Sequence, residues 1–499
     1  MSIYKNVGSI QPGMTMFDLS YEKKFTCDMG QLIPIMCDEV VPGDIFTIGN
    51  QAVIRFQPLV APVLHEINMF VHYFFVPYRI LWEDWEDFIS GGVLGNEVPE
   101  IPTWNPNING LGSLWDFLGF PINVKPQGAY PISFPREAYN FIYNEYYRDE
   151  TLINDIPLQA ELILNRSWEK DYFTSALPFQ QRGTAPALPI SGSTHATWVG
   201  SQVVEAIGAQ NMQFSSTAGD TRAYIPNNTQ ARANALNFMN ANVVSFGTAN
   251  TFDVSDIRLA FQIQKWMERN ARAGARYTEF LKAHFGVSPK DERLQRPEYI
   301  GGSKSPVIIS EVLQTSSTDA TTPQGNLAGH GMSVSDSYCG KYRATEFGLI
   351  MGIMSVMPKP SYSQGINRQW LRRTKYDFYF PEFANLSEQA IIKAEICAVH
   401  NNTEHNEAVF GFQGRYDEMR TKPNMICSEM RSTYDYWHLA RQFDTANPPA
   451  LNQAFITCSP RKDIFAVENV PGLIVSFANL IKAYRPIPLM SEPGLIDHN

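Results

Sequence analysis

Long loops are the feature of this sequence that most limits its possible folds. Three stretches without a clear secondary-structure pattern span residues 101–135, 182–253 and 313–337. A compact enzyme domain joins its elements through short connections, and structureless loops of more than about 15 residues are uncommon unless they have a function. We therefore expect a β-sandwich or β-barrel whose long loops form the functional surface of the protein.

Short apolar runs on either side of these loops indicate β-strands. Residues 31–48 ("QLIPIMCDEVVPGDIFTI") contain two runs separated by Pro42-Gly43-Asp44, a sequence typical of a turn because proline presets φ and glycine accepts a positive φ. Other runs are rich in β-branched and aromatic residues, and they predict strands at 68–77, 377–380, 390–400, 452–458, 463–470 and 473–484. The chain is therefore expected to be mainly β.

Two segments carry a helical pattern instead. Residues 80–89 ("ILWEDWEDFI") place Leu81, Trp85 and Phe88 on one face of a short helix. A longer helix is expected from Ser255, which can cap its start, to Gly286, with Gly274 as the point where it would split.

Charge and cysteine content exclude several classes of protein. The 499 residues carry a formal net charge of −10, so the whole molecule is unlike a basic nucleic-acid-binding domain. Charged residues make up 18% of the chain and aromatic residues 12%, a balance typical of surfaces buried against other chains, although large carbohydrate-binding enzymes share it. The six cysteines form no CxxC pair, which predicts free thiols in a reducing compartment. No run is apolar and long enough for a secretory signal or a membrane span, so we expect no membrane insertion.

A search for catalytic and metal-binding motifs finds no complete set. The GxSxG, P-loop, GxGxxG and HExxH motifs do not occur. Asp171 in "DYFTSALPFQQRG" could act as a base, and the four carboxylates of residues 83–87 could mimic a glycosidase acid pair, but the solvated face of a short helix explains the latter better. Asp497 and His498 lack a third metal ligand. We expect no enzyme, cofactor or metal, with a carbohydrate-active β-protein that uses Glu83 or Asp171 as the alternative.

Basic residues beside aromatic ones are the best candidates for contact with nucleic acid, because cations meet phosphates while rings stack on bases. The first cluster is Arg372, Arg373 and Lys375, beside Trp370, Tyr376 and Tyr379. A second basic stripe follows the long helix at Arg258, Lys265, Arg269, Arg272 and Arg276. For both, a solvated or salt-bridged surface is the commoner explanation.

Many short motifs occur together in a fixed order along the chain. They are "FDLSYEKKFT", "VVPGDIF", "YFFVPYRILWEDWEDF", "YNEYYRDE", "DYFTSALPFQQRG", "RLAFQIQKWMERNARAGARYTE", "RLQRPEYIGG", "TPQGNLAGHG", "VFGFQGRYDEMRTKP", "WHLARQF" and "RPIPLMSEPGLIDHN". Each motif is weak alone, but their number and order make the chain closely resemble the major capsid proteins (F-type coats) of gokushovirus-like Microviridae phages. The sequence departs from that family at "TEFGLIMG" (345–352), at Ser387, at "VPYR" and at the terminal Asn499.

The resemblance implies a fold and a function. The fold would be one viral jelly roll over residues 1–499, an eight-stranded sandwich with long inter-strand insertions and a few helices. Pentamers of the chain would build the T=1 icosahedral shell of a tailless phage around single-stranded DNA, with assembly in the bacterial cytoplasm and residence in the virion. A small basic DNA-binding protein would help to neutralise the genome, in keeping with an acidic coat.

Residues 191–254 differ in composition from the rest of the chain. They are crowded with Ser, Thr, Asn, Gln, Ala and Gly, which bury too little apolar area to fold alone. In the resembled family this region is an insertion between barrel strands. We expect a surface protrusion near a three-fold axis that contacts a receptor on the bacterial host, with an ordinary variable loop as the alternative.

The C-terminal motif contains prolines that limit it to extended conformations. We expect this tail to lie along the shell, with Gly494–Asn499 ordered in the particle and needed for assembly.

Overall fold

The computed structural model describes residues 13–93, 95–96, 99–186, 193–195, 211–214, 223–226, 243–245, 254–313 and 327–490. The chain divides into two compact units. One unit combines Met1–Gln180 with Ala271–Asn499, and the other is Gln181–Asn270.

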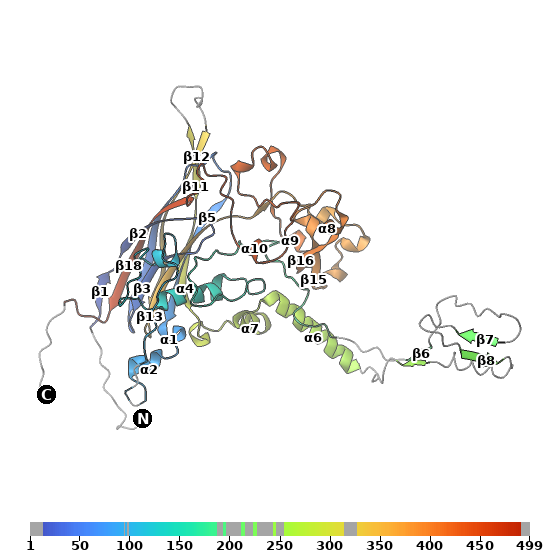
Figure 1. Ribbon diagram of the computed structural model, residues 1–499, viewed down its shortest axis with the longest axis horizontal. Helices are drawn as coiled ribbons and strands as arrows, with labels where there is room; N and C mark the ends of the chain where they lie inside the picture. Colours follow the sequence, from blue (N-terminus) through green and yellow to red (C-terminus); the bar gives the residue numbers. More distant parts are fainter. Residues whose placement is uncertain are drawn as a thin grey trace. The chain divides into compact units, whose positions relative to one another are not determined.

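Two antiparallel sheets form the frame of the first unit (Figure 1). The larger sheet has six strands in the order β1-β18-β4-β12-β11, with β2 paired to the other end of β18. These strands are β1 (Thr15–Asp18), β2 (Tyr21–Cys27), β4 (Ile45–Phe56), β11 (Ile308–Leu313), β12 (Leu327–Arg343) and β18 (Leu473–Arg485). The smaller sheet has the order β10-β5-β13-β3, formed by β3 (Ile33–Val40), β5 (Ile67–Pro77), β10 (Glu298–Pro306) and β13 (Gly348–Pro358). The expected mainly β architecture is confirmed.

The main hydrophobic core contains inward-facing residues of both sheets. Ile48 and Ile54 come from β4, Phe477 from β18, Tyr73 from β5 and Met354 from β13, and each is at most 1% exposed. Strands β4 and β18 alternate between buried and more exposed positions, as expected when only one face of a strand is covered. The two sheets therefore pack as a β-sandwich.

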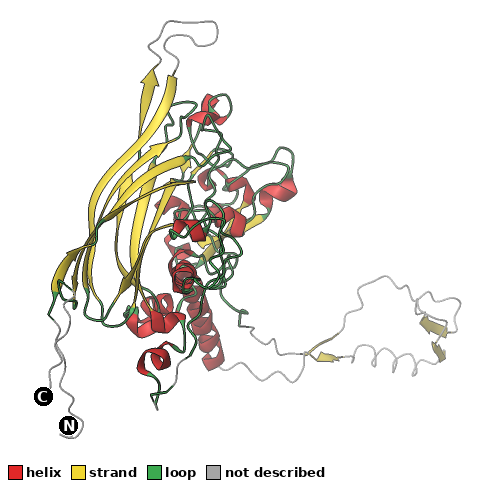
Figure 2. Ribbon diagram, turned by 60° about the vertical axis from the view of Figure 1, so that its left-hand side comes forward, coloured by secondary structure: helices red, strands yellow, loops and turns green. Residues whose placement is uncertain are grey.

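A second core covers the outer face of the smaller sheet. Phe74 and Val76 of β5 and Met351 of β13 pack there against side chains from the segment that follows β5. That segment contains α1 (Tyr78–Leu81), α2 (Trp85–Ser90), α3 (Leu114–Phe117), α4 (Phe134–Ile142) and η2 (Tyr143–Tyr147). Figure 2 shows helical and looped segments lying beside the strands rather than between them.

The edge strand β3 is protected by side chains of neighbouring strands. Lys23 Nζ donates to the carbonyl of Pro34 (2.8 Å), Asn479 Nδ2 to that of Ile35 (3.0 Å) and Arg485 Nη2 to that of Glu39 (3.1 Å). Charged and polar caps of this kind prevent an edge strand from pairing with another chain. Further growth of this sheet at β3 is therefore blocked.

A third core joins loops that lie far apart in the sequence. Phe173, Tyr362, Ile391, Phe410 and Phe455 are all buried there. The surrounding elements are short: β14 (Ser361–Tyr362), η5 (Arg368–Trp370), η6 (Lys375–Asp377), η7 (Pro381–Phe383), β15 (Glu388–Ile392), η8 (Lys393–Glu395), α8 (Thr403–Glu407), β16 (Val409–Gly414), α9 (Asp417–Arg420), β17 (Asn424–Met425), η9 (Ser428–Arg431), η10 (Asp435–Trp437) and α10 (Gln453–Ile456). Helix α7 (Tyr277–Phe285) and η4 (Glu292–Leu294) complete this unit.

The second unit contains four short strands that form two separate pairs. Strand β6 (Ser193–His195) pairs with β9 (Val243–Ser245), and β7 (Asn211–Phe214) pairs with β8 (Ala223–Pro226). Helix α6 (Val254–Ala273) carries the boundary between the units. Most of the predicted insertion at residues 191–254 and all of Gly494–Asn499 lie outside the described residues, so both expectations stay predictions.

Several local expectations are confirmed. Strands β3, β4, β5 and β18 occur where the apolar runs predicted them. The long helix splits at Gly274 (φ +103°), and Gly286 (φ +71°) ends α7 in the left-handed conformation. The helix begins at Val254, so Ser255 is not the residue before its first turn.

Other expectations were wrong. Residues 377–380 and 463–470 form no strand, and 452–458 contain the helical turn α10 because Asn452 Oδ1 accepts a hydrogen bond from the Phe455 N–H (3.0 Å). Residues 80–89 form two helices instead of one. The stretch 101–135 is no free loop, since Trp104, Leu114 and Trp115 are fully buried. In the predicted loop 313–337, residues 327–337 belong to strand β12.

Candidate nucleic-acid interface

The predicted basic cluster lies around the short turns η5 and η6 of the first unit. Asp377 stabilises the turn at residues 373–377, because its Oδ2 accepts hydrogen bonds from the backbone N–H groups of Thr374 (2.7 Å) and Arg373 (2.9 Å). These two hydrogen bonds lower the pKa of Asp377 below its ordinary value. The backbone of the cluster is therefore held by a charged side chain of its own turn.

The three predicted cations occupy different environments. Arg372 turns toward the protein, where Nη2 lies 3.4 Å from Glu418 Oε1 and the guanidinium lies over the Phe378 ring at 5.4 Å. Arg373 and Lys375 are exposed, and Lys375 Nζ lies 5.0 Å from the Tyr376 ring centroid. Arg373 and Lys375 are thus the two cations positioned to meet a ligand.

Aromatic side chains surround these cations at the surface. Trp370 is 71% exposed, and four more rings are between 43% and 57% exposed: Tyr376, Phe378, Tyr379 and Phe380. Large rings this exposed are uncommon on a soluble monomer unless the surface binds something. We call this surface, Trp370–Phe380, the aromatic-basic surface.

The aromatic-basic surface rests on a rigid support. Tyr416 Oη donates a hydrogen bond to the Phe378 carbonyl (3.0 Å) and accepts one from the Phe380 N–H (3.4 Å). Arg415 Nη2 donates to the Tyr376 carbonyl (2.8 Å). Hydrogen bonds from the Tyr416 and Arg415 side chains to the backbone therefore fix the positions from which the rings project.

Exposed cations and rings on a fixed backbone can bind a single strand of nucleic acid, since phosphates meet the cations and bases stack on the rings. The sequence pattern identified Trp370, Tyr376 and Tyr379 but missed Phe378 and Phe380, because the aromatic content of "DFYF" predicts a strand there. Charged residues lie near both ends of this tetrapeptide, and they could have indicated that its rings are exposed. Nucleic-acid contact by Arg372, Arg373 and Lys375 stays a prediction.

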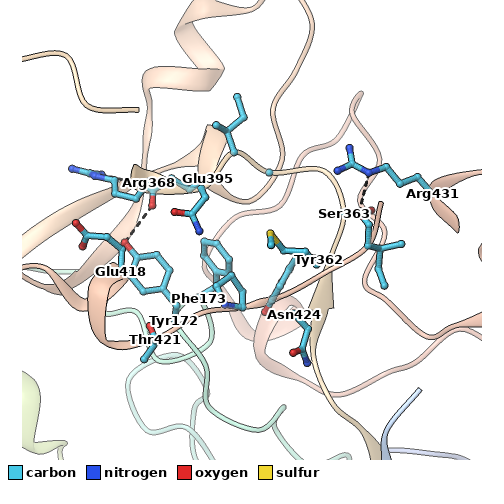
Figure 3. Close-up of a pocket in the computed structure, with 16 residues that line it drawn as sticks. Tyr172, Phe173, Tyr362, Ser363, Arg368, Glu395, Glu418, Thr421, Asn424 and Arg431 are labelled. Carbon is cyan, nitrogen blue, oxygen red and sulfur yellow. Dashed lines mark hydrogen bonds and ion pairs between the residues drawn. The ribbon is translucent and has the colours of Figure 1, made fainter. Parts of the chain in front are cut away.

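A small cavity of about 60 Å³ is lined in part by Glu418, the partner of Arg372 (Figure 3). Its wall contains an ion pair between Arg368 Nη1 and Glu395 Oε1 (2.7 Å), and Tyr172 Oη donates to Glu395 Oε2 (3.2 Å). Burial raises the pKa of Glu395, while Arg368 opposes that shift. Both carboxylate oxygens of Glu395 are engaged, so this buried charge is compensated within the protein.

Asp171, the candidate base, has a structural role. Its Oδ1 accepts hydrogen bonds from the N–H groups of Thr174 (2.8 Å) and Phe173 (2.9 Å), and its Oδ2 accepts one from Tyr362 Oη (2.7 Å). Gln413 Nε2 donates to Ser175 Oγ (2.7 Å) in the same turn. The "DYFTSALP" stretch therefore joins loops of the third core and is not arranged as an active site.

The remaining candidate residues also lack a catalytic arrangement. The carboxylates Glu83, Asp84, Glu86 and Asp87 are all exposed, which agrees with the solvated face expected for them. Among the described residues, no three His, Cys, Asp or Glu side chains are grouped so that they could hold a metal ion. Asp497 and His498 lie outside the described residues.

Part of the second basic stripe consists of structural ion pairs. Arg272 pairs with Glu388, and Arg276 pairs with Glu150 and also donates to the carbonyl of Asn144 (3.0 Å). These two arginines are held by the protein, as the salt-bridged explanation predicted. In the described part of the chain, no helix has the length and apolar character needed to cross a membrane.

Comparison with known proteins gives consistent matches along nearly the whole chain. Residues 7–495 match the family described as capsid protein (F protein). The chain is 32% identical to "Capsid protein VP1" of Chlamydia phage 1, with 99% of this chain and 98% of the relative covered. It is 32% identical to the "Capsid protein VP1" of Bdellovibrio phage phiMH2K (98% and 97% covered) and 31% identical to that of Spiroplasma virus 4 (94% and 93%).

Proposed function

Because the chain belongs to the phage capsid protein (F protein) family, we propose that copies of it assemble into the T=1 icosahedral shell of a small tailless phage with a single-stranded DNA genome. Membership of this family makes the chain a structural coat protein and not an enzyme. The observation that carries the proposal is the match over residues 7–495, which leaves no large part of the chain for another function. The shell would be assembled in the bacterial cytoplasm and form the surface of the virion.

We also propose that the two sheets form a viral jelly roll. Strand β13 lies between β3 and β5, so a strand near residue 350 is inserted between two strands near residues 36 and 72. Such returns of a late strand to early ones are typical of the Greek-key connections from which jelly rolls are built. The eight-strand count of the ideal fold remains part of this proposal, since the described sheets have six and four strands.

The aromatic-basic surface supports a contact with packaged DNA. Arg373 and Lys375 supply charge and Trp370 supplies a stacking surface, while Arg372 supports the turn through Glu418. A net charge of −10 requires another source of neutralisation, and a small basic DNA-binding protein would provide it.

The insertion at residues 191–254 is proposed to protrude near the three-fold axes and to bind a receptor on the host. Its polar, weakly charged composition supports a solvent-facing position. Replacing residues 191–250 with a short Gly-Ser linker should leave particles that assemble but bind host cells poorly. Particles that bind normally would contradict the receptor role without affecting the shell role.

Expression of the full chain tests the main proposal. Purified protein should sediment as pentamers or closed shells, and images of these shells should show T=1 icosahedral symmetry. A chain that folds yet remains monomeric under assembly conditions would overturn the proposal.

DNA contact is tested on the assembled shells. Arg373→Ala with Lys375→Ala should reduce the single-stranded DNA retained by shells, while Arg343→Ala on the exposed surface of β12 serves as the matched control. Equal DNA content in the variant and control shells would remove the aromatic-basic surface from the proposal.

A further inference from the structure

An apolar hollow of about 300 Å³ lies beside the protected edge strand β3. Its wall is formed by Trp85 and Phe88 of α2, Phe134 of α4 and Ile132, and its rim carries Cys37 and Glu39 of β3. Trp85 and Phe88 are only half-buried, and among these residues Glu39 is exposed.

The rings of this hollow form one connected aromatic group. Trp85 lies 4.9 Å from Tyr78, 5.9 Å from Phe88 and 6.0 Å from Phe134, measured between ring centroids. Grooves lined by aromatic rings are the usual binding places for proline-containing extended segments, because such segments lose little conformational entropy when they bind. The aromatic wall of the hollow therefore favours an extended, proline-containing segment as its ligand.

A segment of this type leaves the same end of the sandwich. Strand β18 ends at Arg485, whose Nη2 forms an ion pair with buried Asp44 (2.9 Å) and donates to the carbonyl of Glu39 (3.1 Å). Glu39 is also a rim residue of the hollow. The residue that precedes the segment, Arg485, therefore contacts a residue of the hollow. In Figure 1, β1, which pairs with the end of β18, lies at the same end of the sheets as α1 and α2.

The segment after Arg485 exposes apolar side chains to water. Its sequence is Pro-Ile-Pro-Leu-Met (486–490), and Ile487, Leu489 and Met490 are 41%, 69% and 70% exposed. Prolines at alternate positions remove two backbone N–H groups, so the segment cannot join a sheet as a regular strand. Burial of these side chains requires an apolar surface that tolerates an extended, proline-limited backbone.

We propose that this hollow receives the segment Pro486–Met490 of a second copy of the chain. In the described chain the segment itself starts over the β3–β4 turn, with Pro486 against Gly43, and its last residues remain exposed. The hollow and the segment are different patches of one subunit, so their pairing is heterologous, and repeated heterologous contacts form a ring when the rotation between neighbours closes. Such a ring is a natural unit of a shell, and the inference rests on the proposed shell assembly.

Crosslinking between engineered cysteines tests the contact directly. Glu39→Cys on the rim and Leu489→Cys on the segment are placed in separate chains, each with exposed Cys427→Ser, and the two chains are assembled together. Native Cys37 interferes little, because burial raises the pKa of its thiol to about 12. Mild oxidation of the particles should give a disulfide-linked dimer on a non-reducing gel.

The control pairs Leu489→Cys with Val334→Cys, a position that is 68% exposed on the larger sheet and should give no dimer. Particles that form without the Glu39–Leu489 dimer would overturn this inference while leaving the shell function intact. A chain that forms no particles in any variant would instead contradict the proposed function. With both cysteines in one chain, a crosslink confined to single chains would show that the segment fills its own hollow and would also overturn the inference.

Assembly yield gives a second readout. Replacing Ile487, Leu489 and Met490 together by Ser should lower the yield of closed particles about tenfold, since a few buried apolar anchors carry most of the binding at an interface. The control is Leu162→Ser, which is 60% exposed in the first unit and outside this contact. An unchanged yield in the triple variant would contradict the proposal.

Discussion

The two sheets of the first unit differ in how much of their surface the chain itself covers. Every residue of β13 is buried, and in β5 all but one are, because the sandwich core lies on one face and the α3–α4 segment on the other. Strands β4 and β18 of the larger sheet alternate between buried and more exposed residues. We call the smaller sheet, which contains β5 and β13, the covered sheet, and the larger sheet, which contains β4 and β18, the open sheet.

The difference between the sheets arises because a long insertion of the chain packs on only one of them. The segment that follows β5 (α1 to η2), which we call the covering segment, packs on the covered sheet, so both faces of β5 and β13 are buried within one molecule. The open sheet keeps one face uncovered, where apolar residues are mixed with charged ones: Val53, Arg55, Met332, Val334, Asp336, Tyr338, Ile474 and Lys482. Substitutions on the two sheets should therefore have very different effects on the free energy of unfolding.

The largest expected effect is at Phe74 on the covered sheet. Its ring is 1% exposed and packs against Tyr146 at 4.7 Å and Tyr299 at 5.5 Å. Phe74→Ala should lower the free energy of unfolding by about 3–5 kcal/mol through lost burial and a new cavity. The measurement is denaturant unfolding of the unassembled chain, with Tyr338→Ala as the aromatic control, since Tyr338 is 69% exposed on the open sheet. Equal losses for both variants would show that the two sheets do not differ.

A smaller but still large effect is expected where the covering segment is anchored. Glu161 accepts hydrogen bonds from Trp104 Nε1 (3.0 Å) and from the N–H groups of Asn107 (2.8 Å) and Ile108 (2.7 Å), and it lies 3.7 Å from Arg136. Glu161→Ala leaves the buried N–H of Trp104 and the buried charge of Arg136 without this partner and should cost about 3 kcal/mol.

The matched control is Glu22→Ala on the open sheet, whose carboxylate pairs with exposed Lys24 and should contribute less than about 1 kcal/mol. Thermal unfolding of both variants measures the difference. A Glu161 variant as stable as the Glu22 variant would mean that the covering segment is held by apolar packing alone.

The sequence pattern predicted strands β3, β4, β5 and β18 correctly, but it did not identify the other six strands of the two sheets or the layer that covers the smaller sheet. Continuous apolar runs such as "NMFVHYFFVP" correctly indicated a strand, because a strand covered on both faces has no polar side. Residues 101–135 show neither helical nor strand periodicity, and this pattern predicts a loop. Their burial depends on Trp104, Leu114 and Trp115 meeting the sheet, and the density of Trp, Phe and Leu was the only local signal.

Candidate sites were harder to predict for a similar reason. The cations of the aromatic-basic surface could be found by composition, but which of them faces outward depends on distant partners. Arg372 turns inward because Glu418 lies 46 positions along the chain and is 6% exposed. Sequence spacing contains no information about such a pair.

The junction between the two sheets should respond to pH. Asp38 on β3 is partly buried, which raises its pKa to about 6, while Arg485 and Lys23 oppose the shift and Tyr21 and Cys37 lie nearby. The folded chain therefore holds this proton more tightly than the unfolded chain does, and stability should fall as the pH rises from about 4 to about 6. We expect a loss of about 1–2 kcal/mol, reduced by the partial exposure of the group.

Asp38→Asn should remove this dependence, which unfolding measured at several pH values would show. The same slope in the variant would assign it to another group. Lys23, whose pKa burial lowers to about 8, acts in a separate window at higher pH and does not disturb the test.

The smallest expected effect is a substitution on the open sheet, and it makes the strictest comparison. Val334 on β12 is 68% exposed beside Val53, whereas Val76 on β5 is fully buried against the covering segment. Valine to threonine keeps the β-branched shape and exchanges one methyl for a hydroxyl, so it tests polarity alone. Val334→Thr should change the free energy of unfolding by less than about 0.5 kcal/mol, because water solvates the new hydroxyl. Val76→Thr should cost about 1–3 kcal/mol, because its hydroxyl enters an apolar layer. Denaturant unfolding of the unassembled chain measures both, and a large loss at Val334 would mean that this face is already covered within one molecule.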